Sequence, residues 1–276
     1  MKMNLSFSAR SHIGRVRINN EDNLYCDGAA MTPENRDAPF ALSGGADTPC
    51  IFAVCDGMGG EADGEFASLT AVAALAEHAE AIESAASAEA DEIHTAVRKF
   101  VTDANGRLCD AMRAKPGRMG TTLALAVVTD EAVYAYNLGD SRIYVLKEGR
   151  VCRLSEDHTL AAQKVEMGLL TEEEARTSRW GHSLTRHLGL FEDEMIVVPA
   201  AAEPLPIGGG CRLLLCSDGL TDMVRDARIE EILRSGPAAE DAAERLLAEA
   251  LRNGGRDNVT CVVVDVTPVP ARAAAQ

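Results

Sequence analysis

Residues 51–60, IFAVCDGMGG, contain the pattern that decides the fold. Four apolar residues lead through Cys55 to a carboxylate at Asp56, and three glycines follow within four positions. A short apolar run bounded by glycine is typical of a buried strand. The stretch therefore predicts a strand that ends by presenting an acid on a backbone that other groups can approach closely.

The combination of a strand and an acid recurs along the chain. Four further acids stand at the ends of strand-like runs, namely Asp22, Asp140, Asp218 and Asp257. Taken singly, each has another explanation, because Asp beside Gly is common in turns. Carboxylates gathered at neighbouring strand ends would repel one another, so they must either bind protons or bind cations. Oxygen ligands of this kind suit Mg²⁺ or Mn²⁺.

The remaining pattern alternates blocks of strands with pairs of helices. Strands are predicted within residues 4–11, 22–27, 51–56, 121–154, 211–218 and 259–267, and residues 28–49 are predicted to form a long loop or insertion. Two long helices follow the glycines. The first should bury one face made of Phe66, Leu69, Val72, Ala73 and Ala76, and the second one made of Ile93, Val97, Phe100, Val101, Ala104 and Leu108. Further helices are expected at 158–167, 171–176, 228–234 and 239–252.

Segregated strands and helices predict an α+β layered sandwich. We expect one domain over residues 1–268 and a disordered tail over 269–276, since neither repeats nor an interdomain linker are visible. The chain is long enough, at 276 residues with 46% hydrophobic residues, to bury a large core.

The charge balance is strongly acidic. With 27 basic and 43 acidic residues the formal net charge is −16, which argues against a nucleic-acid or anionic-membrane surface. The N-terminus lacks the apolar core of a secretory signal, and no apolar run reaches transmembrane length, so we expect a cytoplasmic protein. The sequence carries no signal of oligomeric state, and a monomer is the default expectation. The eight cysteines form no CxxC pair, and reduced core thiols are expected.

Eight motifs in this order resemble the metal-dependent Ser/Thr protein phosphatases, the protein phosphatase 2C or PPM family, in their compact bacterial form. They are VRINNEDN, DGMGGEADGEFAS, GTTLALAVV, NLGDSRIYVL, EDHTL, SLTRHLG, LLLCSDGLTDMV and GRDNVTCVVVDV. The resemblance covers about residues 5–267. It implies a four-layer αββα sandwich, in which two antiparallel sheets are flanked by helix pairs, and a flap over about residues 155–190.

The resemblance also implies a site with two Mn²⁺ or Mg²⁺ ions. The implied ligands are Glu21, Asp22, Asp56, the carbonyl of Gly57, Asp218 and Asp257. A water bridging the two ions would attack phosphorus directly, without a covalent phosphoenzyme. Arg17 matches the phosphate-binding arginine of the family, although an edge-strand surface arginine is the alternative. Asp140 matches an acid that, with Asp218, holds a third and weaker ion; its alternative is a hairpin turn residue.

Some positions depart from the family pattern. Met58 and Glu61 stand where relatives often carry histidine, and methionine cannot act as a general acid. In the flap, Trp180 would either contact a phosphoprotein or be an exposed or half-packed loop residue. The six histidines show no zinc-ligand spacing, so no metal role is expected for any of them.

The leading hypothesis is a metal-dependent phosphatase of phosphoserine and phosphothreonine in proteins that opposes a bacterial Ser/Thr kinase. Two alternatives remain open. One is a catalytically silent module that binds a phosphoprotein or a kinase, and the other is a phosphatase of small-molecule phosphates. The presence of every implied metal acid favours an active enzyme.

Overall fold

The computed structural model describes residues 2–59, 63–87, 90–115 and 117–269, and its strands form two antiparallel sheets. The first sheet has the strand order β10-β9-β13-β14-β1-β4. Its strands are β1 (Met3–His12), β4 (Phe40–Asp47), β9 (Arg142–Lys147), β10 (Arg150–Arg153), β13 (Cys211–Cys216) and β14 (Val259–Pro268).

The second sheet has the order β11-β8-β7-β5-β2-β3, with β12 paired to β8 and β6 paired to β5. Its strands are β2 (Asp22–Cys26), β3 (Ala29–Ala30), β5 (Cys50–Gly59), β6 (Met119–Thr121), β7 (Leu123–Val128), β8 (Ala132–Leu138), β11 (Ala200–Ala201) and β12 (Leu205–Pro206).

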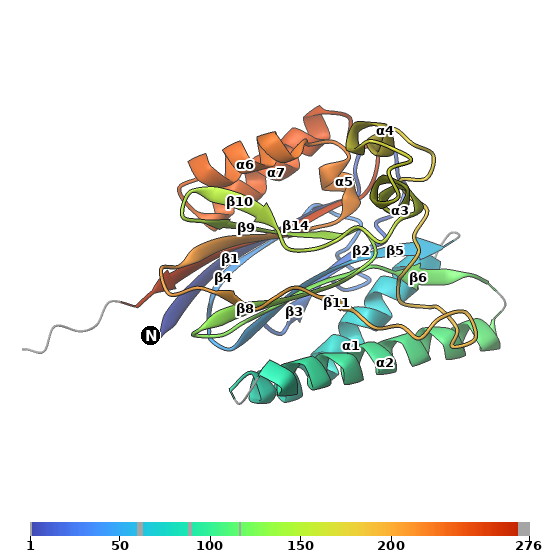
Figure 1. Cartoon of the computed structure of the whole chain (residues 1–276), viewed down its shortest axis with the longest axis horizontal. Coiled ribbons are helices and arrows are strands. Elements are labelled where there is room, and N and C mark those ends of the chain that lie inside the picture. The colour runs from blue at the N-terminus through green and yellow to red at the C-terminus, as the bar shows by residue number, and fades with distance from the viewer. Residues whose placement is uncertain (1, 60–62, 88–89, 116, 270–276) are drawn as a thin grey trace, which may run out of the picture.

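The helices cover the outer faces of both sheets, which confirms the layered α+β prediction (Figure 1). Helices α1 (Asp63–Ala86) and α2 (Ala90–Ala114) lie against the second sheet, and α6 (Asp226–Ser235) and α7 (Ala239–Arg252) lie against the first. The short helices are α3 (Leu160–Glu166), α4 (Glu172–Arg176) and α5 (Asp218–Thr221). The layer order is therefore helix, sheet, sheet, helix.

Strand β5 is buried on both faces, and this explains its continuous apolar run. Ile51 and Ala53 face helices α1 and α2, whereas Phe52 and Val54 lie in the core between the two sheets. In that central core the Phe52 ring meets Phe7 of β1 edge to face, with ring centroids 5.4 Å apart. A strand sandwiched in this way needs apolar residues at every position, because neither face meets water.

The predicted buried face of the first long helix is wrong except at Val72, which is buried. In α1, Phe66 is 46% exposed, and the buried positions are mainly small residues such as Ala67, Ala71 and Ala74. Alanine on the covered side allows α1 to lie close to β5 and α2, where phenylalanine would not fit. The six apolar residues predicted to form the face of α2 are all buried.

The segment 28–49 contains strands, which corrects the prediction of a loop. Strand β4 pairs with β1 along its length and forms the edge of the first sheet. Its sequence, FALSGGAD, is rich in small residues and alternates only weakly in burial. An edge strand of this composition is ordered by its partner's hydrogen bonds, and these leave no hydrophobic pattern in the sequence.

The predicted flap, residues 155–190, contains α3 and α4 between polar loops. The first of these helices begins at Leu160 and is capped by Thr159, whose side chain accepts a hydrogen bond from the Ala162 amide. All eight cysteine thiols are free. Within the described ranges, no helix combines the length and the apolarity that crossing a membrane requires. Most of the predicted tail, residues 270–276, lies outside the described residues.

Candidate metal centre

Both sheets bring acids to the same end of the sandwich. Asp22 and Asp56 lie directly opposite each other in the antiparallel pairing of β2 with β5. Asp218 follows β13, and Asp257 precedes β14, its neighbour in the first sheet. The hydroxyl of Ser217 donates a hydrogen bond of 2.8 Å to Oδ2 of Asp22, and this bond joins the two sheets directly at the acids.

Asp22 is 1% exposed and incompletely partnered. Among the described residues, its Oδ1 is a buried side-chain oxygen with no hydrogen-bond partner. Burial raises the pKa of Asp22 to about 7, and repulsion from Asp218 and Asp257 contributes to the increase. An unpartnered buried oxygen destabilises a folded protein. A cation bound to Oδ1 of Asp22 would offset that cost.

Asp56 stands at the centre of the acids. Burial raises its pKa well above the usual value, and repulsion from Asp22, Asp218, Asp140 and Asp257 raises it further. Its backbone is fixed, because its carbonyl accepts hydrogen bonds from the Thr121 hydroxyl and the Thr122 amide, each of 2.9 Å. A rigid strand therefore holds the Asp56 carboxyl group among like charges.

Two glycines allow the second sheet and α1 to meet beside these acids. A Cβ atom at Gly57 would lie 2.1 Å from the carbonyl oxygen of Gly64 and 2.6 Å from that of Glu21. A Cβ atom at Gly64 would lie 2.7 Å from Oε1 of Glu21. The Gly57 amide donates to the Glu21 carbonyl at 3.2 Å, so the chain before β2 is held against β5. At Gly57 the close atoms belong to the backbone and cannot rotate away, so only glycine fits there, whereas a Cβ atom at Gly64 would have to displace the Glu21 carboxyl group.

The loop before β2 carries Arg17 and Glu21 to the same place. Asn258 organises this loop, because its Oδ1 accepts from the Glu21 amide at 2.8 Å and its Nδ2 donates to the carbonyls of Ile13 and Asn19. Arg17 donates to Oδ2 of Asp257 at 2.6 Å, and its side chain is 46% exposed. Its guanidinium thus lies at the border between the acids and solvent.

A second cluster lies next to the first and shares Asp218. Ligand atoms of Asp140, His182 and Asp218 all lie within 4.8 Å of one another, a spacing that suits a metal ion. Nδ1 of His182 is 3.2 Å from Oδ2 of Asp218. That hydrogen bond raises the pKa of His182 to about 9. Burial by itself would raise the pKa of Asp218. The hydrogen bond with His182 and the contact with the Asp56 carboxyl group outweigh burial, so the pKa of Asp218 is lowered.

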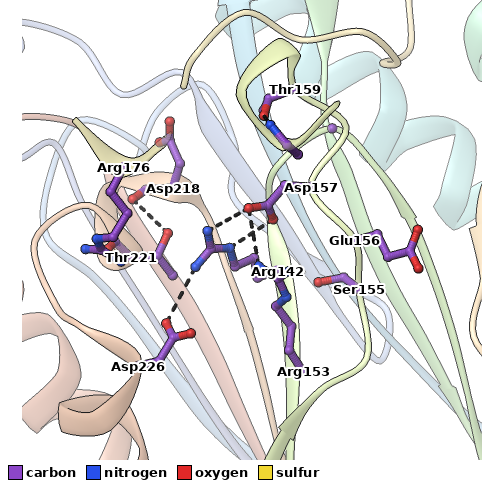
Figure 2. Close-up of polar contacts among 12 residues, drawn as sticks. Arg142, Arg153, Ser155, Glu156, Asp157, Thr159, Arg176, Asp218, Thr221 and Asp226 are labelled. Atoms are coloured by element: carbon purple, nitrogen blue, oxygen red, sulfur yellow. Dashed lines mark hydrogen bonds and ion pairs between the residues drawn. The ribbon is translucent and has the colours of Figure 1, made fainter. Parts of the chain in front are cut away.

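The base of the flap is joined to the first sheet by an arginine network (Figure 2). Arg142, at the start of β9, donates to both carboxylate oxygens of Asp157, at 2.9 and 2.7 Å, and also forms an ion pair with Asp226. Farther along the flap, Arg176 donates to the carbonyl of Thr221, at the end of the helix that begins with Asp218. The flap is therefore attached close to both acid clusters.

The residues present fit divalent cations. Their donors are carboxylate oxygens, they repel one another, and one of them has a buried oxygen without a partner. Buried carboxyl groups arranged in this way hold protons unless cations replace them. Hard cations such as Mg²⁺ and Mn²⁺ prefer such oxygen ligands.

The structure brings the eight residues expected from the sequence to one end of the sandwich: Arg17, Glu21, Asp22, Asp56, Gly57, Asp140, Asp218 and Asp257. Glu61 lies outside the described residues. Trp180 is partly buried and packs against Arg179 and Lys164 in cation–π contacts of 4.3 and 5.2 Å, as the half-packed alternative predicted.

Sequence reasoning missed His182, Ser217 and Asn258. No ligand spacing in the sequence pointed to His182, because Asp140 and Asp218 stand 42 and 36 positions away from it along the chain. Ser217 and Asn258 are each adjacent to a predicted acid, and that adjacency was the only available signal.

A family model described as Protein phosphatase 2C matches residues 33–255. The chain therefore belongs to the protein phosphatase 2C family. The Serine/threonine protein phosphatase PstP of Mycobacterium tuberculosis is 36% identical over 264 residues, which are 95% of this chain and 45% of PstP. The chain thus spans about half the length of that relative. The Serine/threonine phosphatase Stp of Listeria monocytogenes is 34% identical over 261 residues, 93% of this chain and 94% of Stp.

Solved structures show the same architecture. The crystal structure of Mycobacterium tuberculosis PstP has a TM-score of 0.76 at 32% identity and covers 96% of this chain and 100% of that one. The catalytic domain of PstP in complex with two manganese ions has a TM-score of 0.74 at 33% identity, with the same coverage of both chains. Stp1 of Staphylococcus aureus has a TM-score of 0.78 at 27% identity and covers 96% of this chain and 95% of Stp1.

Proposed function

We propose that this chain is a metal-dependent phosphatase that hydrolyses phosphoserine and phosphothreonine in proteins. The observation that carries the proposal is the buried, unpartnered Oδ1 of Asp22 within a group of mutually repelling carboxyl groups. Relatives named Ser/Thr phosphatases support the proposal, as does the relative solved with two manganese ions.

The residues that would hold the cations come from both sheets. We assign two Mn²⁺ or Mg²⁺ ions to Glu21, Asp22, Asp56, the Gly57 carbonyl, Asp218 and Asp257, and a third, weaker ion to Asp140 together with Asp218. When bound, such ions lower the pKa of the attacking water and neutralise charge on the phosphoryl group.

Arg17 is assigned to the substrate phosphate. Its side chain is half exposed and its pairing with Asp257 is monodentate, so part of the guanidinium is available to a phosphate oxygen. Arginine can bind two phosphate oxygens at once in a fixed orientation, whereas lysine acts as a point charge. We expect Arg17 to place phosphorus over the acids.

The protein groups around the site support direct attack by water. Cys55 precedes Asp56, but burial raises the pKa of its thiol to about 12, and a protonated buried thiol is a poor nucleophile. Met58 has no proton to donate to the leaving group. These properties are consistent with a reaction that forms no covalent phosphoenzyme.

The cellular role follows from the class of substrate. We propose that the chain opposes a bacterial Ser/Thr kinase in the cytoplasm by dephosphorylating the kinase or its targets. We further propose that residues 1–268 act as one phosphatase domain in a monomer. The formal charge of −16 agrees with protein substrates rather than nucleic acid.

The test uses p-nitrophenyl phosphate and a phosphothreonine peptide, each with Mn²⁺ and with EDTA. We expect Mn²⁺-dependent hydrolysis of both, and near-complete loss in Asp56→Asn with an unchanged circular dichroism spectrum. If metal-dependent turnover is absent at high protein concentration, the proposal is wrong, and calorimetric titration with Mn²⁺ then tests the alternative of a silent binding module. If small phosphate esters have far higher kcat/KM than phosphopeptides, proteins are not the substrates.

A further inference from the structure

We infer that His182 supplies a nitrogen ligand from the flap to the third cation site, and that this ligand makes the site prefer Mn²⁺ to Mg²⁺. The inference rests on the proposed function and assigns a role to a residue outside the metal-binding acids identified from the sequence. It starts from the spacing of His182, Asp140 and Asp218, whose ligand atoms lie within 4.8 Å of one another.

The two ring nitrogens of His182 have different surroundings. Nδ1 faces Oδ2 of Asp218 at 3.2 Å, whereas Nε2 lies 3.5 Å from Oδ2 of Asp222. Histidines that bind metals commonly donate their second N–H to a carboxylate, which fixes the tautomer and the ring orientation. Asp222 is placed to do this, so Nδ1 would be the nitrogen that faces the cation.

The backbone around His182 is held in place on both sides. The Leu160 amide donates to the carbonyl of Ser183 at 2.9 Å, and the Ala161 amide donates to that of Trp180 at 3.3 Å. Leu184 forms a bridge with Thr159, the N-cap of α3. The side chain therefore extends from a segment anchored to α3, although it is itself 65% exposed.

The chemistry of the ligand set predicts the selectivity. Mg²⁺ prefers oxygen ligands and keeps its water shell, so it gains little from imidazole. Imidazole binds later transition metals well, and affinity for nitrogen rises along the series from Mn²⁺. One nitrogen beside two carboxylates would therefore strengthen Mn²⁺ binding more than Mg²⁺ binding. A cation bound here would also link the flap to the acids of the first sheet.

The test compares the full chain with His182→Asn, which keeps a polar side chain but removes the imidazole. The matched control is His78→Asn, because His78 of α1 forms a similar pair, at 3.1 Å, with the partly exposed Asp103 of α2. Titration calorimetry measures Mn²⁺ and Mg²⁺ binding, and pulsed electron paramagnetic resonance detects imidazole nitrogen coupled to bound Mn²⁺. Both readouts are independent of turnover.

In His182→Asn we expect the affinity of the weakest Mn²⁺ site to fall at least about tenfold. Removing only the hydrogen-bond partner of a metal ligand typically costs about 10–100-fold, and loss of the ligand itself should cost no less. Mg²⁺ affinity should change by less than about threefold. The nitrogen coupling should disappear in His182→Asn and persist in His78→Asn. Asp222→Asn should weaken the same Mn²⁺ site by about tenfold while retaining the coupling.

Three results would overturn the inference while leaving the proposed function intact. They are unchanged Mn²⁺ affinity in His182→Asn, equal losses for Mn²⁺ and Mg²⁺, and nitrogen coupling that survives the substitution. A lower turnover with unchanged Mn²⁺ binding would likewise overturn it and assign His182 to substrate or proton transfer. If the unsubstituted chain binds no Mn²⁺ at all, the proposed function itself fails.

Discussion

Replacing Gly57 by alanine adds one methyl group where β5, α1 and the loop before β2 come together. The new Cβ would lie 2.1 Å from the carbonyl oxygen of Gly64 and 2.6 Å from that of Glu21, whereas ordinary contacts begin at 3.4 Å. Both neighbours are backbone atoms, so no side-chain rotation can relieve the overlap. Either α1 must move away from β5, or the hydrogen bond from the Gly57 amide to Glu21 must break.

We expect Gly57→Ala to cost about 3 kcal/mol, the upper part of the range for overpacked sites. For a domain of this size that lowers Tm by about 5 °C. Gly106→Ala is the matched control, because nothing lies within 4 Å of its new Cβ and the residue is exposed within α2. It should raise stability by about 1 kcal/mol through helix propensity.

The assay is thermal unfolding in EDTA, followed by circular dichroism, so that bound metal does not contribute to stability. Repeating the thermal unfolding with added Mn²⁺ in place of EDTA measures the stabilisation that the metal adds. This stabilisation should be smaller in Gly57→Ala, because the substitution displaces Glu21 and Asp56. A Gly57→Ala protein with a Tm equal to or above that of Gly106→Ala would refute the reasoning from close backbone contact.

Three further predictions concern the charged groups. Because the folded pKa of Asp22 is raised from 3.8 to about 7, the metal-free protein should lose stability as pH rises from about 4 past 7, by an amount on the order of 4 kcal/mol. Asp22→Asn should remove the part of the pH-dependent loss that Asp22 causes, which unfolding in EDTA across pH measures, and it should also reduce the stabilisation by Mn²⁺, which unfolding with added Mn²⁺ measures. Arg142→Gln should cost about 2 kcal/mol, because it removes two charged hydrogen bonds and leaves the partly buried Asp157 only the 3.3 Å contact with Arg153. Adding Asp157→Asn should recover part of the loss, and a double variant less stable than Arg142→Gln in urea unfolding would contradict this. Arg17→Ala should mainly raise KM for a phosphopeptide, and unchanged kcat and KM would exclude its phosphate role.

The sequence by itself determined the strands that need apolar residues on both faces and the acids at their ends. The run 51–55 is apolar at every position because β5 lies between two cores, so it was visible without a structure. The same holds for α2, whose heavier side chains repeat at helical spacing. Asp56 and Asp218 were identifiable because each follows such a run and precedes glycine.

Only the tertiary structure decided the features that depend on distant partners. Strand β4 is ordered by backbone pairing with β1, which requires no particular side chains. The covered face of α1 is made mainly of small residues whose size matters only against β5 and α2, so Phe66 was wrongly predicted to be buried. His182 meets Asp140 and Asp218 because the flap folds back over the strand ends. Such contacts leave no periodic signal, since hydrogen bonds and ligand distances depend on positions in space and not on spacing along the chain.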